Sequence, residues 1–469
     1  MRKVPDAAWL ALAFLASRAV LLACGLHFNF DLDWFVLPDP VYLRDDLLRT
    51  LWNFHSFPPG WAALTGVLLK LSPEHTAVLA QAVFIGLGLL LTLSLFSLAR
   101  LIGLSRGGAM ALALGFSLTP PALYFENLYH YEFIVTALLT WSAVLFHRAL
   151  RAQSARAWAG FFAVCAALGF FRSMMPLSWF LLVAGLAVLL ARRARKQVLL
   201  GALLPLVALL GLSLKNLAVF GVFGAHTQDG NLLMATADQL PDDVHRAWEA
   251  EGKLSHFGKR PFAGPRTFLP SFPDEPQWAH PTLTDLERPS FGSPNFNHWV
   301  FLRVNVERRR DVLAYLREYP GAFVERAWNR GLRASLSPST RWHPRTGTAA
   351  SPHFEHRQVL GAWEDLWNRF VHESFFAPVG LYALLPVGLL WAAWRARRLL
   401  AADDDAQRAL GGWWCFVLAQ VLWVGALMSA ATVGEHARYR FVIEAFLWLV
   451  MAGAVSDLVS RLRRRRAQA

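Results

Sequence analysis

The chain has 469 residues, of which 55% are hydrophobic and 17% are charged. A soluble globular protein is usually about 45–50% apolar and about 25% charged, and here the apolar residues lie in long blocks rather than at amphipathic spacing. A helix needs about 20 apolar residues to cross about 30 Å of hydrocarbon, and in lipid its backbone groups must be paired internally. The sequence therefore predicts an α-helical integral membrane protein and argues against a soluble one.

The formal net charge is +13, which in a soluble protein would suggest nucleic-acid binding. The excess of Lys and Arg lies instead in short clusters between the apolar blocks, which is typical of the positive-inside rule. We therefore expect membrane lipids, and not nucleic acid, as partners. The cysteines lie inside apolar blocks without CxxC or Cys/His metal-ligand spacing, and we interpret all three as packing residues: Cys24, Cys165 and Cys415.

The apolar blocks predict about ten transmembrane helices. The block at 107–125 is interrupted by Pro120-Pro121, and the block at 157–171 is short and ends before Arg172. The predicted spans are 7–27, 75–99, 107–125, 131–149, 157–171, 174–191, 197–220, 374–394, 410–431 and 438–459.

The basic clusters fall on alternate loops, and this alternation gives the predicted orientation. All of the clusters lie on one side if the first span starts inside, so both termini are predicted to be cytoplasmic. The opposite side then receives a first outer loop at 28–74 and an extracytoplasmic domain at 221–373. These segments divide the chain into an N-terminal transmembrane module at 1–220, the extracytoplasmic domain, and C-terminal spans with a basic cytoplasmic tail at 374–469.

The first outer loop has helical content of its own. Over 42–54 (YLRDDLLRTLWNF), leucines gather on one helical face and charged residues on the other, which predicts an amphipathic helix at the membrane interface. A Pro-Pro pair then opens the apolar run 60–71, which is too short to span and predicts an interfacial or partly inserted helix. The later domain is predicted to be mixed or mostly helical, with a helical pattern over 304–336 that breaks at 319–321.

Carboxylates gather where the first span leaves the membrane. Asp31, Asp33 and Asp39 lie among aromatic residues there. Ionisable groups near the bilayer are costly and are candidates for function, so a raised pKa and a general-base role fit these residues, with a structural role as the alternative. Asp45 and Asp46 lie on the polar face of the predicted amphipathic helix, and we interpret them as solvated.

A second polar group lies at the outer turn YFENLYHYEF. Its two carboxylates and one imidazole, Glu126, Glu132 and His130, could position a hydroxyl acceptor or bind a divalent cation. Helix capping and interfacial hydrogen bonding are the alternative interpretation. We assign His55, from the first outer loop, to the same acceptor-positioning group, and we predict no dedicated metal site.

Arginines form the third group. Arg438 and Arg440 open the last span in GEHARYRFVIE, where a guanidinium can bind a lipid phosphate in bidentate fashion. Arg172, in the short outer turn FFRSMMP, has the same potential. The alternative is that these side chains extend to the headgroups without a specific ligand. Walker A, GxGxxG, GxSxG and HExxH motifs are all missing from the sequence, so we do not expect an ATP-driven machine.

Taken together, these segments resemble the polytopic glycosyltransferases that use polyprenyl-phosphate sugars, the GT-C superfamily. The similarity is to the bacterial branch of protein-mannosyltransferase-like and aminoarabinose-transferase-like enzymes, and it covers most of the chain in order and topology. One departure concerns the first-loop acid, which is often Asp-Glu in the family, whereas here Asp39 precedes Pro40. The segments that carry the resemblance are PDPVYLRDDLLRTLWNFHSFPPGW, YFENLYHYE, LREYPGAFVERAWNRG and GEHARYRFVIEAFLWLV.

The resemblance implies transfer of a sugar from a polyprenyl-phosphate carrier to a hydroxyl acceptor (lipid, glycan or protein) on the outer face of a bacterial inner membrane. Asp39 would act as general base in an inverting single displacement, with Asp31 and Asp33 competing for that role. Arg438, with Arg440 or Arg172, would stabilise the departing phosphate. No cofactor is required, although a divalent cation stays an open alternative.

Two other functions have similar hydropathy. A lipid or solute transporter, or a flippase, would more often have inverted repeats and charged residues near mid-membrane. The sequence has no evident internal repeat, and its candidate residues gather at one outer face, which favours an enzyme. A catalytically inactive assembly subunit on the same scaffold stays open as well.

Overall fold

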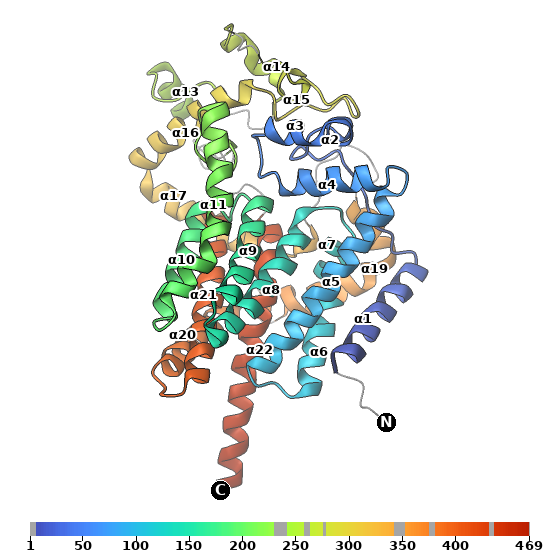
Figure 1. The fold of residues 1–469 in the computed structure, drawn as a ribbon, viewed down its shortest axis with the longest axis vertical. Helices are drawn as coiled ribbons and strands as arrows, with labels where there is room; N and C mark the ends of the chain where they lie inside the picture. Colours follow the sequence, from blue (N-terminus) through green and yellow to red (C-terminus); the bar gives the residue numbers. More distant parts are fainter. Residues whose placement is uncertain are drawn as a thin grey trace.

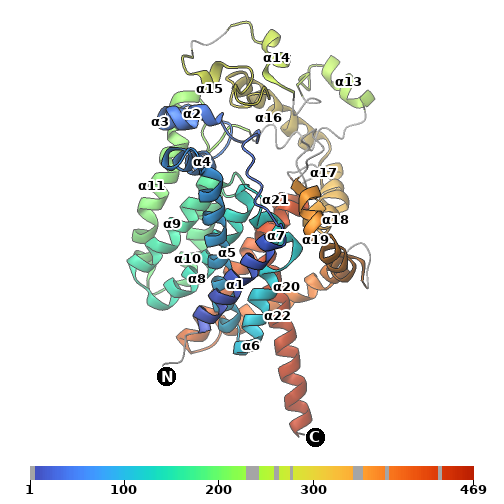
Figure 2. The same cartoon turned by 90° about the vertical axis from the view of Figure 1, so that its right-hand side faces the viewer.

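The computed structural model describes residues 6–228, 242–257, 263–274, 278–341, 352–374, 380–430 and 436–468. Every regular element in these ranges is a helix, and the only β pairing among them is two isolated bridges. Figures 1 and 2 show long helices packed side by side, with α1 (Asp6–Ala23) beginning and α22 (His436–Gln468) ending at the same end of the bundle. The fold is therefore all-helical, and no sheet accompanies the helices in the described part of the later domain.

Among the described residues, six helices are long and apolar enough to cross a membrane, or seven if one bent pair counts as a single span. The bent pair is α6 (Arg106–Ser117) and α7 (Pro120–Glu126), whose axes differ by 58°. The six long helices are α1, α5 (Thr76–Leu101), α8 (Tyr131–Ala152), α11 (Arg195–Phe220), α21 (Asp405–Ala430) and α22. The chain is thus a multi-pass helical membrane protein.

The predicted count of ten spans is not confirmed. The blocks at 157–171 and 174–191 form α9 (Ala155–Phe171) and α10 (Leu177–Leu190), which have 17 and 14 residues. At 1.5 Å per residue, a 14-residue helix is only about 21 Å long, shorter than the hydrocarbon core. The described part of the block at 374–394 is a 3₁₀ turn followed by α20 (Leu385–Leu400), which carries three arginines.

The bend between α6 and α7 follows from local sequence, as the Pro-Pro interruption predicts. The Thr119 side chain accepts a hydrogen bond from the Ala122 backbone N–H (3.3 Å), which is the usual N-cap arrangement. Pro120 occupies the first position of α7, where its missing N–H costs nothing. A continuous helix through this point would lack hydrogen bonds at both prolines, so the chain stops and restarts.

Helix α8 is the centre of the bundle. Within its apolar stretch of 18 residues, 72% of the residues are buried, whereas in the corresponding stretch of α1, which lies at the periphery, 17% are buried. Helices α5, α9, α21 and α22 all pack against α8. Aromatic rings fill the contacts between them, including the stacked pair Phe146 and Phe416, whose centroids are 4.6 Å apart.

Short helices cover one end of the bundle, opposite the end where α1 begins (Figure 1). We call this end the loop end. The loop end holds α2 (Pro40–Asp45), α3 (Leu47–Trp52), α4 (Gly60–Leu71), α13 (Asp242–Ala250), α14 (Pro265–Phe268), α15 (Pro281–Thr284) and α16 (Val300–Glu318).

The predicted amphipathic helix over 42–54 forms two helices, α2 and α3, because Asp46 ends the first and caps the second by accepting a hydrogen bond from the Arg49 N–H (3.4 Å).

The predicted break at 319–321 is confirmed, since α16 ends at Glu318 and α17 (Pro320–Arg326) follows. A π-helical turn (Ala327–Leu332) and α18 (Arg333–Ser335) continue from it. Helix α19 (Pro352–Asn368) packs against α7, and the Trp363 indole N–H donates to the Leu118 carbonyl at the α6–α7 bend (2.8 Å). Figure 2 shows α19 beside the bundle, below the short helices of the loop end.

Candidate functional site

A buried ionic cluster lies where three helix ends of the bundle meet. Glu132, in the first turn of α8, has no exposed surface. Its Oε1 lies 2.9 Å from Nη1 of Arg172 and 3.1 Å from Nε of Arg438, and its Oε2 contacts Nδ1 of His130. All four residues are at most 3% exposed. We call these residues the arginine–glutamate cluster.

Each member of the cluster is placed by a helix terminus. His130 holds the N-cap position of α8 with an extended backbone, so its side chain and that of Glu132 emerge from the same turn. Arg172 is the C-cap of α9, also with an extended backbone (φ −135°, ψ 125°). Arg438 lies in the first turn of α22. Because α8 packs against both α9 and α22, three segments distant in sequence converge on one carboxylate.

Aromatic rings enclose the two guanidinium groups. The Arg172 guanidinium carbon lies 4.7 Å from the Tyr131 ring centroid and 4.4 Å from that of Tyr439. The Arg438 Nη2 donates a hydrogen bond to the Tyr439 hydroxyl (3.0 Å). Cation–π contacts of this kind gain strength when water is excluded, so the rings favour retention of both positive charges.

The first outer loop touches the cluster through Trp34. Its ring centroid lies 4.5 Å from the His130 imidazole, and Trp61 of α4 lies 5.1 Å from the same imidazole. Burial lowers the pKa of His130, and the neighbouring Glu132 carboxylate opposes this effect. We therefore take the imidazole as neutral.

Within the described residues, the cluster sets two guanidinium groups, those of Arg172 and Arg438, against the single carboxylate of Glu132. Among the described residues, the Nε and Nη2 atoms of Arg172 have no hydrogen-bond partner, although both atoms are buried. Buried N–H groups without acceptors are costly, and a phosphate oxygen is an acceptor of the right charge. The geometry therefore suits an anion.

Arg440 has a different environment from Arg438. Its Nη1 donates to the backbone carbonyls of Ser335 (2.6 Å) and Ser337 (2.8 Å), and its Nη2 donates to the Ser339 hydroxyl (2.7 Å). These bonds attach the segment after α18 to α22. The structure thus brings Arg172 and Arg438 together and places Arg440 outside the cluster. Glu435, in the same sequence motif, lies outside the described residues.

Glu126 is also separated from the cluster. Its two carboxylate oxygens accept hydrogen bonds from Nε (2.8 Å) and Nη2 (2.6 Å) of Arg18 on α1. The Arg18 Nη2 also donates to the Ser117 carbonyl at the α6–α7 bend (2.9 Å). A Cβ at Gly88 of α5 would lie 2.7 Å from the carboxylate, so glycine permits this close approach. Glu126 therefore joins α1, α5 and the bent pair.

Asp39 is buried and holds the N-cap of α2. Its Oδ1 accepts hydrogen bonds from the Val41 N–H (2.8 Å) and the Ser290 hydroxyl (2.8 Å), and its Oδ2 accepts from the Ser290 N–H (2.8 Å). The loop that follows α15 therefore covers Asp39 in this conformation.

Asp33 and Asp31 belong to the same contact between the first outer loop and the loop after α15. Asp33 forms an ion pair with Arg288 and accepts a hydrogen bond from the Ser293 hydroxyl (2.7 Å). Arg288 also donates to the Trp34 carbonyl (2.9 Å), while Asp31 accepts from the Asp33 N–H (2.8 Å). Burial lowers the pKa of Arg288, and Asp33 opposes this effect. Sequence analysis did not identify Arg288, because no local pattern marks its partner 255 residues away.

His55 lies between the first outer loop and the later domain. Its Nδ1 is 2.7 Å from the Thr227 hydroxyl, and its Nε2 is 2.9 Å from the Asn297 carbonyl. Burial lowers the pKa of His55 to about 3, so the ring is neutral. The structure thus places His55 in a contact with Thr227 and Asn297 and not beside His130 and Glu132.

The described residues contain no group of three or more His, Cys, Asp or Glu side chains arranged to hold a metal ion. Comparison of the chain with protein-family models finds no match, and comparison with curated proteins finds none. The fold therefore defines the chain as a helical multi-pass membrane protein, and its function has to follow from the chemistry of the site itself.

Proposed function

We propose that the chain is a membrane glycosyltransferase that moves a sugar from a polyprenyl-phosphate carrier to a hydroxyl acceptor. One observation carries the proposal: two buried arginines share a single carboxylate, and two N–H groups of Arg172 lack acceptors among the described residues. A phosphate held by Arg172 and Arg438 would supply the missing acceptors and balance the charge. The aromatic rings around the guanidinium groups would keep the phosphate in a partly dry site, where charged hydrogen bonds are strongest.

The proposed reaction is an inverting single displacement. The acceptor oxygen bonds to the anomeric carbon of the sugar, while the bond between that carbon and the phosphate oxygen breaks. The hydroxyl proton passes to the Asp39 carboxylate, and the electron pair of the broken bond stays on the polyprenyl phosphate. Arg172 and Arg438 would stabilise the negative charge that accumulates on the leaving group. This displacement needs no cofactor.

The contacts of Asp39 set a condition on this mechanism. Both of its oxygens bind Ser290, so the Ser290 contact has to open before an acceptor hydroxyl can reach the carboxylate. The cap bond from Val41 can persist, since it occupies one lone pair of Oδ1. Trp34, five residues before Asp39, contacts His130, so the first outer loop and the cluster adjoin one another.

The site would lie on the outer face of a bacterial inner membrane. The alternation of basic loops supports this orientation. Alkaline phosphatase fused after Pro289 should be active, and a fusion after Arg193 should be inactive. The reverse pattern would place the loop end in the cytoplasm and remove the reason for a lipid-carried donor.

The direct test uses purified full-length protein in lipid nanodiscs with a radiolabelled polyprenyl-phosphate hexose. The wild type should bind polyprenyl phosphate and release it from the labelled donor when a membrane extract supplies acceptors. Arg172→Ala and Arg438→Ala should each lose donor binding. Arg193 is an exposed arginine in the turn between α10 and α11, which lies at the end of the bundle opposite the loop end (Figure 1), so Arg193→Ala is the matched control and should behave as the wild type. No binding by the wild type would overturn the proposal.

One observation favours a second function, that of a lipid flippase or transporter. Broken helices are common in transporters, and the bent α6–α7 pair lies beside the buried ion pair of Arg18 and Glu126. Reconstituted vesicles with a fluorescent polyprenyl-phosphate analogue distinguish the two. Movement between leaflets without sugar transfer would support the transporter.

A further inference from the structure

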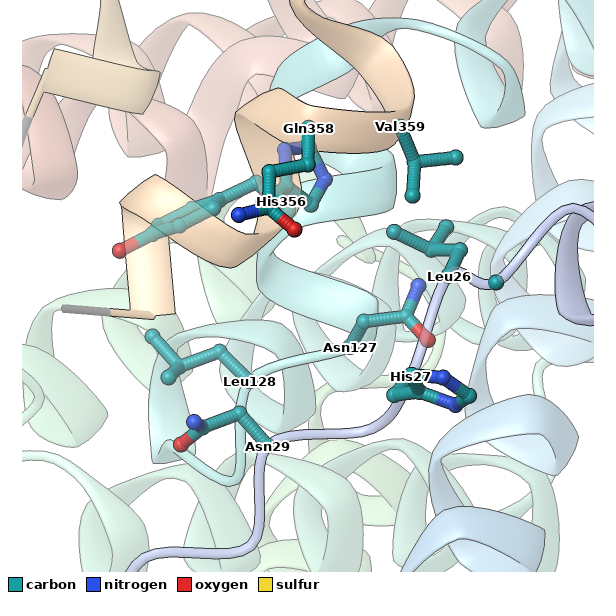
Figure 3. Close-up of a pocket in the computed structure, with 10 residues that line it drawn as sticks. Leu26, His27, Asn29, Asn127, Leu128, His356, Gln358 and Val359 are labelled. Carbon is teal, nitrogen blue, oxygen red and sulfur yellow. The ribbon is translucent and has the colours of Figure 1, made fainter. Parts of the chain in front are cut away.

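A cavity of about 300 Å³ lies between the end of α1, the turn joining α7 to α8, and α19. Figure 3 shows side chains of α19 facing those of the segment after α1 and of the α7–α8 turn. Its volume is at the lower end of the range of small-molecule pockets, roughly 300–1,000 Å³, so it suits a single ring better than a chain of sugars. The lining residues are Gly25, Leu26, His27, Asn29, Tyr124, Asn127, Leu128, His356, Gln358 and Val359.

The lining is polar, and none of its described residues is an aspartate, glutamate, lysine or arginine. Its two imidazoles are those of His27 and His356. Amide groups come from Asn29, Asn127 and Gln358, and such groups can both donate to and accept from hydroxyls. Hydrogen-bond groups beside apolar side chains match a sugar ring, whereas an ammonium group would find no carboxylate and an acidic group no lysine or arginine.

Asn29 lines the cavity and has a side-chain oxygen without a partner among the described residues. Its Oδ1 is buried and has no hydrogen-bond partner among the described residues. The backbone around it is fixed, because the Asn29 N–H donates to the Asn127 carbonyl (2.7 Å) and the Tyr129 N–H donates to the Asn29 carbonyl (2.9 Å). A buried amide oxygen without a donor is costly. Rotation of the amide toward the cavity would let a ligand hydroxyl provide the donor.

The cavity adjoins the arginine–glutamate cluster along the chain and through ring contacts. Leu128 lines the cavity, and His130 and Glu132 follow in the same turn. Phe125 of α7 stacks on Phe441 of α22 with ring centroids 4.4 Å apart, and Phe441 lies one helical turn after Arg438. The α7–α8 turn thus carries residues of both the cavity and the cluster, as neighbouring sites for a sugar and its phosphate would require.

The two helices that flank the cavity expose apolar side chains on their outer surfaces. Val20 of α1 is 61% exposed, and Leu366 of α19 is 60% exposed. Between the helices, Leu26, Leu123 and Leu360 form a small apolar cluster. Large exposed apolar side chains on a membrane protein are expected to face lipid. A ligand carried on a lipid could therefore approach between α1 and α19.

We propose that this cavity binds an uncharged sugar carried on a lipid and discriminates against amino sugars and sugar acids. The inference rests on the proposed function for its biological role, since the bound sugar would be the one transferred. It narrows the donor to neutral hexoses or pentoses, which the proposed reaction alone does not specify. Binding itself can be measured without any transfer reaction.

The test measures binding of short-chain alkyl glycosides, below their micelle-forming concentrations, to full-length protein in nanodiscs. Octyl glucoside should bind saturably, and octyl glucuronide and an octyl amino-glucoside should bind at least tenfold more weakly. Methyl glucoside distinguishes a soluble sugar from a lipid-carried one, and it should bind at least tenfold more weakly than octyl glucoside. Equal binding of all four glycosides would overturn the proposal.

Variants locate the binding site. Asn29→Leu should weaken octyl glucoside binding at least tenfold, and Val359→Trp, which fills the cavity from α19, should do the same if Asn29→Leu fails to fold. Leu366→Trp, on the exposed face of α19, is the matched control and should bind as the wild type. Gln358→Glu should reverse the charge preference and favour the amino sugar. Unchanged binding in both cavity variants would refute the assignment.

Failure of this inference and failure of the proposed function give different results. Arg172→Ala should leave octyl glucoside binding unchanged, because that ligand has no phosphate. If octyl glucoside binds in the cavity but polyprenyl phosphate does not bind the protein, the proposed function fails and the sugar site stands. If polyprenyl phosphate binds and neutral glycosides do not, the cavity assignment fails and the phosphate site stands.

Discussion

The arginine–glutamate cluster makes a distinctive prediction about Glu132→Gln. This change keeps the shape of the side chain and removes its charge, so Arg172 and Arg438 lose their shared counter-ion. Removing one partner of a buried ion pair costs about 3–5 kcal/mol, because the remaining charge stays buried without compensation. Glu132 is fully buried and contacts both guanidinium groups, so we expect a loss of folding stability within this range.

An added anion should restore much of that stability. A phosphate between the two guanidinium groups would replace the missing carboxylate, and the neutral glutamine would no longer compete with it. A ligand at about 100 times its Kd stabilises a folded protein by about 2.7 kcal/mol. Thermal unfolding of the purified variant with and without polyprenyl phosphate measures this rescue, which should recover roughly half or more of the loss.

Glu126→Gln is the matched control. Glu126 is similarly buried and forms an ion pair of the same kind, but it has a single arginine partner, Arg18, whose other donors reach Ser17 and Ser117. This variant should also lose stability and should gain little from polyprenyl phosphate. Equal rescue of the two variants, or rescue of neither, would refute the assignment of Arg172 and Arg438 to a phosphate site.

Three further predictions concern single side chains. Arg438→Ala should lower donor-dependent kcat/KM about tenfold or more, since a charged hydrogen bond contributes roughly 1.5–3 kcal/mol. Arg463 is exposed, so Arg463→Ala should change kcat/KM little, and steady-state kinetics compare the two variants. Asp39→Asn should abolish sugar transfer, because asparagine cannot take the proton of the acceptor hydroxyl. The protein should still fold, because asparagine caps α2 as well as aspartate does. Transfer activity measured on folded, monodisperse protein tests this prediction. Burial lowers the pKa of His55 to about 3, so the unfolded chain binds a proton below pH 6.5 while the folded protein does not. The contribution of the neutral His55 ring to the free energy of unfolding should therefore be fully present above about pH 6.5 and fall on acidification by up to about 1.4 kcal/mol per pH unit. Thermal melts at pH 7 and pH 5 measure this loss, which should be smaller in His55→Asn.

The sequence predicted those features of the fold that depend on neighbouring residues. Pro120 ends one helix and starts another, and Pro320 does the same, because proline lacks an N–H and disfavours helix at the preceding residue. Long apolar blocks predicted the helical membrane class, because such a block is likewise a property of neighbouring residues. The predicted count of ten spans was not confirmed, because hydropathy counts apolar residues, whereas the length of a helix depends on where caps and turns end it. Helix α10 stops after 14 residues although the apolar block is longer.

The contacts of the candidate residues could not be predicted in this way. Ser290, which binds both oxygens of Asp39, lies 251 residues away in the sequence. No periodicity connects the two positions, and serine is common in loops. Similarly, Glu126 and Glu132 lie in one short motif, yet the turn between α7 and α8 directs them to different arginines. Only the three-dimensional arrangement distinguishes a structural pair from the arginine–glutamate cluster.

Comparison of the cluster with two other buried arginines, Arg18 and Arg440, indicates that the cluster has a role beyond folding. Every guanidinium nitrogen of Arg18 has a hydrogen-bond partner. Both terminal nitrogens of Arg440 have one or more, and only its Nε is buried without a partner among the described residues. Arg18 therefore shows that the fold can satisfy an arginine that it uses as a structural connector. Arg172 keeps two buried nitrogens without partners in the described part of the chain, beside a second arginine that shares the same carboxylate. Apolar side chains of similar size would stabilise such a position at least as well, so a ligand with negative charge is the reason that we infer for two arginines at this site.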